Sequence, residues 1–418
     1  MIWLLLACSG EDETPAGPVT ADFATCDGDD TRTFATPPTW DDVAPLVAEN
    51  CVTCHTADGI AGIALDTHAE ASRWSAAMAS AVANRTMPPW PARDCASCTT
   101  YRDARWLGDD EVATIVAWAA GGAPPGDGPD ERLVPASVPE GLGDEADAVM
   151  PIPFAYTPDA DVLDDYRCFV VDPGLASDKF VTAVEVLPDQ VQEVHHVLVY
   201  VTTDAAGDAD ADARNQDVDG DGVPDGYRCD GGPGVTNVDM VAGWAPGTGA
   251  LRFPDGTGLR LPAGRRMIAQ IHYNTGNGVT PDRTAVAVAL ADTVPFPAEF
   301  LQVSAVRELV LPPGQPEVEV VTHQSTPVAG RVWGAAGHMH RLGTSVSVRS
   351  DRGACALDIP RWDFDWQTVY FFEEPYQTTP GEELELRCTF DTTSVTEEVR
   401  WGEGTNDEMC IAFLYVSQ

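Results

Sequence analysis

Val194-His195-His196-Val197-Leu198-Val199-Tyr200-Val201-Thr202 is the stretch of sequence that most directly indicates the fold. Its β-branched and aromatic residues favour strands, and no Gly or Pro interrupts them. Similar short runs recur after residue 150, separated by Pro and Gly turns, at Phe180–Val186, Met267–Tyr273, Val318–Thr322 and Val346–Arg349. This pattern predicts two all-β antiparallel sandwich domains, jelly-roll-like, over residues 151–295 and 296–418.

Histidines concentrate on these predicted strands. Five of the eight fall into three groups: His195-His196, His272, and the pair His338 and His340. His338 and His340 are two residues apart on a probable strand, so both imidazoles point to one side and can chelate one ion. His195 and His196 would diverge on a regular strand, so joint binding requires a bulge or a strand end. A single such histidine is usually a core or surface residue, but three groups on β-elements favour metal binding.

A different signal lies near the N-terminus. Cys51-Val-Thr-Cys54-His55 is the c-type haem attachment motif, in which two thiols bond the vinyl groups and the imidazole binds iron. A bare Cys-x-x-Cys would more often be a zinc or redox pair, but the adjoining histidine favours haem. Helical patterns surround the motif, beginning with a helix that Thr39 can cap. Residues 39–125 are therefore predicted to be a small all-α cytochrome c domain.

The haem iron needs a second axial ligand. Met87 is the favoured residue, because it stands about 30 residues after the haem histidine on a proline-held loop. Met78 and His68 are the rivals, although Met78 lies in an Ala-rich helical run where a core role is expected. A final helix from Asp109, ended by Gly121, is expected to close the domain.

The cysteine count indicates an exported protein. The chain has eleven cysteines, and removing Cys8 for lipid and two for haem leaves 11 − 3 = 8, an even number for disulfides. Cys95 and Cys98 lie close together and are expected to form a local or structural disulfide rather than a redox centre. Cys26 and Cys355 have no predicted partner.

Charge and the N-terminus limit the partners. The net charge of −42 argues against nucleic acid, and no run of 18 apolar residues beyond the N-terminus predicts a membrane span. Residues 1–8 resemble a lipoprotein-type signal with Cys8 as the lipid acceptor, the alternative being an ordinary apolar end. An acidic tether, 9–38, follows, and residues 126–150 are predicted to be a linker. We expect a periplasmic or cell-surface protein, an outer-membrane lipoprotein, that meets the membrane only through the lipid.

One acidic loop spaces its carboxylates as calcium loops do. Asp217, Asp219, Asp221 and Asp225 occupy positions 1, 3, 5 and 9 of such a loop. Arg228 stands where an EF-hand has its glutamate, so the loop is not an EF-hand. Structural calcium is predicted, and the alternative is a solvated acidic loop.

Several ordered motifs between residues 150 and 418 resemble the copper type II, ascorbate-dependent monooxygenases, a family that includes peptidylglycine α-hydroxylating and dopamine β-monooxygenases. The resemblance is carried by Tyr166-Arg167-Cys168, His195-His196-Val197, Gly243-Trp244-Ala245-Pro246-Gly247, Gln270-Ile271-His272-Tyr273, His338-Met339-His340 and Asp407-Glu408-Met409-Cys410. It implies one copper held by His195, His196 and His272, and a second held by His338, His340 and Met409. Imidazoles suit both copper oxidation states, and a thioether favours the reduced ion. The family's disulfides imply the pairs Cys388–Cys410 and Cys168–Cys229.

The resemblance also implies a reaction. O₂ would be used at the His338, His340 and Met409 copper to hydroxylate a C–H bond of a small molecule, and the other copper would supply the second electron. An external reductant is needed, and the haem is expected to relay electrons or to act as an independent carrier. The alternative function is a non-catalytic haem or copper electron-transfer or copper-binding protein.

The expected substrate differs from that of the peptide-hydroxylating members. Those members clamp a carboxylate with an Arg, an Asn and a Tyr, whereas Ala336, Ile411 and Phe413 occupy the corresponding positions here. A buried carboxylate would find no partner among these side chains. A non-peptide substrate is therefore predicted.

Overall fold

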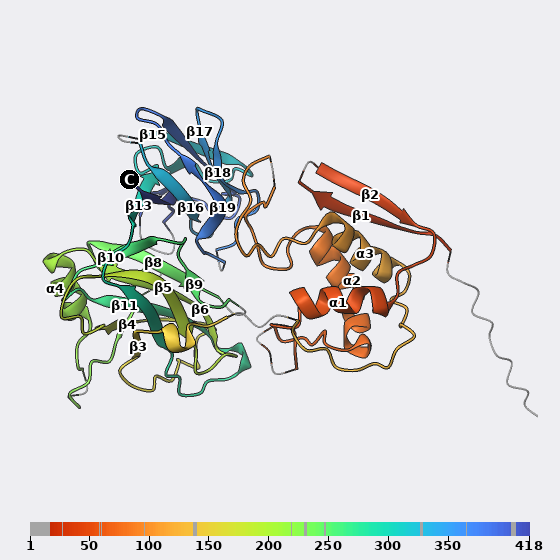
Figure 1. Ribbon diagram of the computed structural model, residues 1–418, viewed down its shortest axis with the longest axis horizontal. Helices are drawn as coiled ribbons and strands as arrows, with labels where there is room; N and C mark the ends of the chain where they lie inside the picture. The colour runs from red at the N-terminus through yellow and green to blue at the C-terminus, as the bar shows by residue number, and fades with distance from the viewer. Residues whose placement is uncertain are drawn as a thin grey trace, which may run out of the picture. The chain divides into compact units, whose positions relative to one another are not determined.

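The computed structural model describes residues 17–418 except 27, 58, 60, 96, 137–139, 219, 230–231, 246–247, 327–328, 365 and 403–406, and the side chain of residue 277. These residues divide into two units (Figure 1). The first contains residues 17–52, Leu65–Pro88 and Leu107–Val134. The second contains Thr53–Ala64, Pro89–Trp106 and Pro135–Gln418.

Three helices and a hairpin form the first unit. Thr39 precedes α1, and its backbone N–H donates to Asp42 at 2.8 Å, so the predicted N-cap is confirmed. The predicted start at Asp109 and end at Gly121 of the last helix are also confirmed. The bounds are α1 Trp40–Asn50, α2 His68–Ala83, α3 Asp109–Ala120, β1 Val19–Thr25 and β2 Gly28–Phe34.

The predicted architecture, an all-α cytochrome c domain followed by two sandwiches, is wrong. β1 and β2 pair antiparallel and pack on the helices, while Thr53–Ala64 and Pro89–Trp106 belong to the β-rich unit. The described chain is mostly β and its helices are few. Residues 19–34 are polar in composition, which favours a tether over a hairpin. Its inward residues nevertheless alternate, and Ala21 and Phe23 are buried.

The described strands of the second unit form two pairs of facing layers. A nine-stranded sheet has the order β19-β16-β22-β13-β10-β5-β12-β3, with β9 on β5. A five-stranded sheet, β7-β4-β11-β6-β8, packs on its first half, and a four-stranded sheet, β15-β20-β17-β18, packs on its second half. β10 and β13 pair in parallel, which joins both halves into one sheet.

The elements of this unit have the following bounds. The first half contains η1 Gly143–Glu145, β3 Ala148–Pro151, β4 Asp164–Val171, β5 Lys179–Leu187, β6 Val194–Thr202, α4 Ala205–Arg214, β7 Tyr227–Arg228, β8 Val238–Trp244, β9 Leu251–Arg252, β10 Thr257–Leu261, β11 Met267–Asn274, η2 Thr275–Asn277 and β12 Ala285–Ala291. The second half contains β13 Phe296–Ser304, β14 Val310–Leu311, β15 Val318–Ser325, β16 Arg331–His338, β17 Gly343–Ser350, β18 Cys355–Ile359, β19 Tyr370–Gln377, β20 Glu383–Phe390, β21 Val399–Arg400 and β22 Ile411–Ser417.

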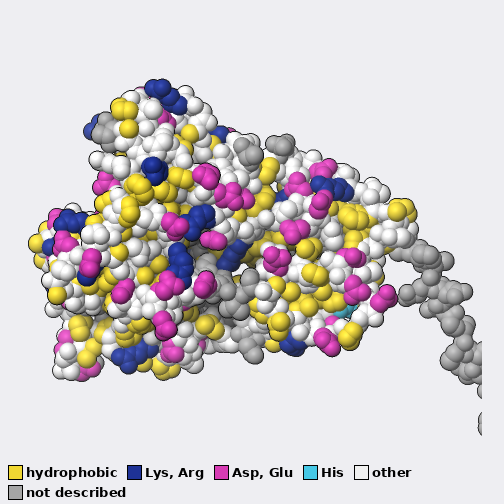
Figure 2. Space-filling model, viewed as in Figure 1, with side chains coloured by type: hydrophobic (Ala, Val, Ile, Leu, Met, Phe, Trp, Pro, Cys, Tyr) yellow, Lys and Arg dark blue, Asp and Glu magenta, His cyan; other side chains and the backbone are white. Residues whose placement is uncertain are grey.

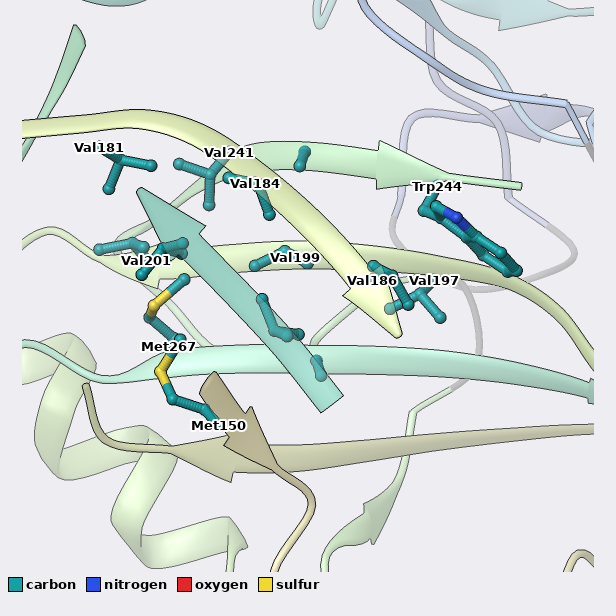
Figure 3. Close-up of a cluster of buried hydrophobic side chains, with 14 of the residues drawn as sticks. Met150, Val181, Val184, Val186, Val197, Val199, Val201, Val241, Trp244 and Met267 are labelled. Carbon is teal, nitrogen blue, oxygen red and sulfur yellow. The ribbon is translucent and has the colours of Figure 1, made fainter. Parts of the chain in front are cut away.

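Alternate strand residues build the core between the layers. Val197, Val199 and Val201 of β6 are buried at every second position, against Val181 and Val184 of β5 (Figure 3). Because alternate residues of β6 point inward, the intervening residues are available for other contacts.

Residues 89–106 are far in sequence from β18 and β19 but are fixed to both strands. Cys98 forms a disulfide with Cys355, and Tyr101 makes a β-bridge with Phe372 on β19. The prediction of a local disulfide between Cys95 and Cys98 is therefore wrong. We call residues 89–106 the strap.

Both disulfides that the resemblance implied, Cys168–Cys229 and Cys388–Cys410, are confirmed. Disulfides of this kind are typical of exported proteins. Cys8 lies outside the described residues.

Acidic side chains are scattered over the visible surface rather than gathered in one place (Figure 2). Among the described residues, no helix combines the length and apolarity needed to cross a membrane.

Candidate metal centres

Three histidines meet where β6 and β11 pair. His272 pairs with His196, but the next residue, Tyr273, pairs with Val194, so His195 is an extra residue in β6. This irregularity is the bulge that joint binding by His195 and His196 required. It lets both consecutive side chains approach His272.

The nitrogen atoms of this cluster are close enough to share one ion. His196 Nδ1 lies 3.2 Å from His272 Nδ1 and 3.4 Å from His195 Nδ1. One ligand atom from each histidine lies within 4.8 Å of the others. Two nitrogens bound tetrahedrally at about 2.0 Å from one ion would be about 3.3 Å apart. The three histidines therefore fit a single metal ion.

Burial and contacts with neighbours act on two of these rings, His196 and His272. Asp164 accepts a hydrogen bond from His272 Nε2 at 2.9 Å, so the Nδ1 lone pair of His272 faces the cluster. Tyr166 stacks on the same ring with centroids 4.2 Å apart. Burial, then His195 and Arg341, lowers the pKa of His272 to about 3. Burial, then the two neighbouring imidazoles, lowers the pKa of His196 well below its ordinary value.

A second cluster lies at the end of β16. Gln367 Oε1 lies 2.7 Å from His338 Nδ1, and the carbonyl of Asp407 lies 2.9 Å from His340 Nδ1. Both Nδ1 atoms therefore donate, which leaves each Nε2 as an acceptor. Nε2 of His340 is buried and has no hydrogen-bond partner among the described residues. Such an orphaned nitrogen fits a metal ligand.

Glu408 brings Met409 to this cluster. The Glu408 carboxylate accepts the backbone N–H of His340 at 2.8 Å and that of Met409 at 3.2 Å on the same oxygen. Met409 is buried, and the disulfide of its neighbour Cys410 to Cys388 restrains the loop. Glu408 thus joins the backbones of His340 and Met409, and a thioether from Met409 would suit copper because sulfur binds the reduced ion well. Burial also lowers the pKa of His338 to about 4, so it is a neutral ligand.

Apolar side chains stand next to His338. In the pairing of β16 with β22, Ala336 lies opposite Phe413 and His338 lies opposite Ile411. Ala336 and Ile411 are buried, and Phe413 packs against the core of the first half. A carboxylate placed here would meet no cationic partner among these three residues.

A loop between β18 and β19 links the two clusters. Gln367 Nε2 donates to the Phe364 carbonyl at 2.8 Å, which fixes the amide so that Oε1 faces His338. A Cβ on Gly243 of β8 would lie 2.7 Å from the Gln367 carbonyl oxygen. β8 pairs with β6, which carries His195 and His196. The loop therefore positions His338 while resting on the sheet of the first cluster.

The residues of the haem motif belong to different units. Cys51 and Cys54 are thiols, and Cys54 and His55 belong to the second unit. His55 Nδ1 lies 3.3 Å from the carbonyl of Ile63, so Nδ1 donates and Nε2 is left as an acceptor. Burial lowers the pKa of His55.

The candidate second ligands of the haem differ in exposure. Met87 is 44% exposed, whereas Met78 is buried in α2, as its predicted core role requires. His68 Nε2 lies 2.9 Å from the carbonyl of Ala123, and its ring lies against Trp40 and Trp118. His68 thus has a structural role in the first unit.

The acidic loop binds its own backbone. Asp217 accepts the N–H groups of Gly220 and Gly222 at 2.7 and 2.8 Å, and Asp225 accepts that of Val218 at 2.6 Å. Asp221 accepts the N–H of Val223 at 2.7 Å. Asp219 lies outside the described residues. These hydrogen bonds stabilise the loop.

Sequence reasoning missed the residues that orient the ligands. Asp164 directly precedes the Asp165-Tyr166-Arg167-Cys168 run on β4, and β4 pairs with β11, so strand pairing could have found it. Gln367 carries no comparable signal, because only the folded loop between β18 and β19 brings it to His338.

These observations indicate a class of metal-binding protein. The three-histidine cluster, together with a His-x-His pair whose backbone Glu408 joins to that of a buried methionine, offers the kinds of ligand that copper prefers.

Sequence comparisons find one matching family model and several similar proteins. Residues 302–417 match the model of the copper type II ascorbate-dependent monooxygenase, C-terminal domain. Peptidyl-glycine alpha-amidating monooxygenase A of Xenopus laevis is 26% identical over 203 residues, which are 46% of this chain and 21% of that protein. The rat peptidylglycine alpha-amidating monooxygenase (Rattus norvegicus) is 28% identical over 199 residues, 45% of this chain and 20% of that protein. Dopamine beta-hydroxylase of Canis lupus familiaris is 24% identical over 196 residues, 42% of this chain and 31% of that protein.

The chain thus spans a fifth to a third of the length of these relatives. The matches support the copper type II monooxygenase family, a family of oxidoreductases that use O₂.

Proposed function

We propose that this chain is a copper-dependent monooxygenase that hydroxylates a C–H bond of a small molecule with O₂. His195, His196 and His272 hold one copper, and His338, His340 and Met409 hold the other, which is the catalytic one. Bound copper supplies the one-electron chemistry that O₂ activation needs. Burial lowers the pKa of His196, His272 and His338, so these three imidazoles stay neutral. Hydrogen bonds orient the rings of His272, His338 and His340. The apolar residues Ala336, Ile411 and Phe413 offer a carboxylate no cationic partner.

The observation that carries the proposal is the convergence of the Nδ1 atoms of His195, His196 and His272. Contacts of 3.2 and 3.4 Å between nitrogen atoms are unfavourable unless a proton or a cation lies between them. The buried Nε2 of His340 supports the second centre in the same way.

Metal analysis tests the proposal. The whole chain, loaded with copper and washed, should hold two coppers. His272→Ala should lose one and His340→Ala the other. His323→Ala is the matched control, because that side chain is 54% exposed and lies near Glu385 rather than in either cluster. If all three variants hold equal copper, the ligand assignment is wrong.

Catalysis needs its own measurement, because a copper electron-transfer protein would keep the same ligands. We expect the copper-loaded chain to couple O₂ uptake to hydroxylation of neutral, apolar compounds. The apolar wall of Ala336, Ile411 and Phe413 supports this substrate class. Glycine-extended peptides should be poor substrates. Their efficient turnover would overturn the assignment of the wall.

Covalent haem is a further part of the proposal. Cys51 and Cys54 would bond the haem, and His55 and Met87 would bind its iron. The donor role of His55 Nδ1 supports this, because it leaves Nε2 for the metal. The haem would relay electrons from an external reductant to the coppers. Acid–acetone extraction should leave the haem on the protein, and haem in the organic layer would contradict the attachment.

Two proposals concern the periphery. Structural calcium would be bound by the carboxylates of Asp217, Asp219, Asp221 and Asp225. Equilibrium dialysis with ⁴⁵Ca²⁺ tests this binding.

Cys8 would carry a lipid that anchors an exported protein to the outer membrane. Mass spectrometry of the N-terminal peptide tests the lipid, and an unmodified Cys8 would exclude it.

A further inference from the structure

The backbone around Arg341 is held beside the cluster of His338 and His340. The N–H groups of His340 and Leu342, on either side of Arg341, donate to the two oxygens of Glu408 at 2.8 and 2.7 Å. The indole N–H of Trp362 donates to the His340 carbonyl at 3.2 Å. The Arg341 side chain therefore extends from a backbone that is fixed by contacts on both sides.

An aromatic ring directs the guanidinium. Cζ of Arg341 lies 5.7 Å from the centroid of Phe364, and the Phe364 ring lies edge-on to His340 at 6.3 Å. Phe364 itself belongs to the loop that Gln367 holds on the sheet of the first cluster.

No carboxylate among the described residues pairs with this cation. Glu408 uses both oxygens on backbone amides, and Asp164 accepts from His272. Arg341 is exposed. An exposed guanidinium beside an aromatic ring can bind an anion with two parallel hydrogen bonds.

We infer that Arg341, with Phe364 beside it, is the docking site for a small organic anion at the metal centres, and that this anion is the reductant. The inference rests on the proposed copper function. The chain carries a net charge of −42, so its surface repels anions such as ascorbate, which is a monoanion at neutral pH. A local cation is what an anionic reductant needs to approach buried metal ions in so acidic a protein.

Binding to the metal-free chain tests the site without any copper chemistry. Calorimetric titration under argon with ascorbate should give about tenfold weaker binding to Arg341→Gln than to the unaltered chain. Arg331→Gln is the matched control. Arg331 also stacks on aromatic rings, Phe296 and Trp333, but at the other end of β16. Equal ascorbate affinity in the two variants would overturn the inference.

Two further measurements identify the chemical class of the anion. Hippurate, a carboxylate that is not a reductant, should bind much more weakly than ascorbate, and equal binding of both would make the site a carboxylate substrate site instead.

In the copper-loaded chain, each ascorbate gives up one electron and one proton, and one Cu(II) becomes Cu(I). Arg341→Gln should slow this reduction about tenfold with ascorbate but not with neutral hydroquinone. Equal slowing with both reductants would contradict anion docking. A chain that binds ascorbate through Arg341 but hydroxylates nothing would contradict only the proposed function.

Discussion

Gly243→Ala tests whether the loop of Gln367 positions His338. The new Cβ would lie 2.7 Å from the Gln367 carbonyl oxygen and 3.3 Å from Leu198 Cδ2. Ordinary contact begins near 3.4 Å, so the loop backbone must retreat by about 3.4 − 2.7 = 0.7 Å. The Gln367 side chain would then lose its 2.7 Å hydrogen bond to His338 Nδ1. Residues that orient a ligand typically contribute about tenfold or more to metal affinity.

We therefore expect Gly243→Ala to weaken copper binding at the second cluster about tenfold. Gly207→Ala is a matched control, because its Cβ would also lie 2.7 Å from a backbone carbonyl, that of Asn237, away from both clusters. Overpacking should destabilise both variants by about 1–3 kcal/mol. The assay is copper(I) competition with a chelator in a His195→Ala background, which isolates the second cluster. Equal copper affinity in the two glycine variants would refute the role of the loop.

Three other changes have defined outcomes. Met409→Ala should lose the second copper and all hydroxylation but keep the copper of the three-histidine cluster, and full activity would show that Met409 is no ligand. The metal-free chain should lose stability as pH falls from about 6.5 towards 4. The unfolded chain binds protons near the ordinary pKa of 6.5, whereas burial lowers the pKa of His272 to about 3 and that of His338 to about 4. Thermal unfolding should therefore depend less on pH in His338→Gln, and an unchanged slope would contradict those pKa values. Cys98→Ser should cost about 2–4 kcal/mol of unfolding free energy and open the strap to protease, and a strap still resistant would show that its other contacts suffice.

Local chemistry explains what the sequence could predict. Thr39 marks the start of α1 and Gly121 marks the end of α3, in both cases through contacts within one turn. The residue pattern of Val194–Thr202 predicts its strand. The spacing of His195 and His196 even required a bulge, which the register of β6 and β11 contains. These features depend on neighbours in the chain, so the pattern of residues is enough.

Long-range contacts explain what could not be predicted. Cys98 and Cys355 are separated by 257 residues, and nothing in either stretch distinguishes its partner from other cysteines. The hairpin at Val19–Phe34 is rich in Asp and Thr, so composition alone assigned it to a tether. Gln367 reaches His338 only when the loop between β18 and β19 folds against β8. Orienting residues of this kind follow from tertiary structure.

The parallel pairing of β10 with β13 affects how this protein can be divided. β13 forms three residue pairs with β10 and seven with β22, so it is an interior strand of the large sheet. A recombinant fragment that begins at residue 296 would turn this strand into a bare edge with unsatisfied amides and carbonyls. Such an edge recruits strands from other molecules, so the fragment is expected to aggregate. The matched segment, residues 302–417, begins inside this same strand. The segment that sequence similarity delimits is therefore expected to be smaller than the unit that folds.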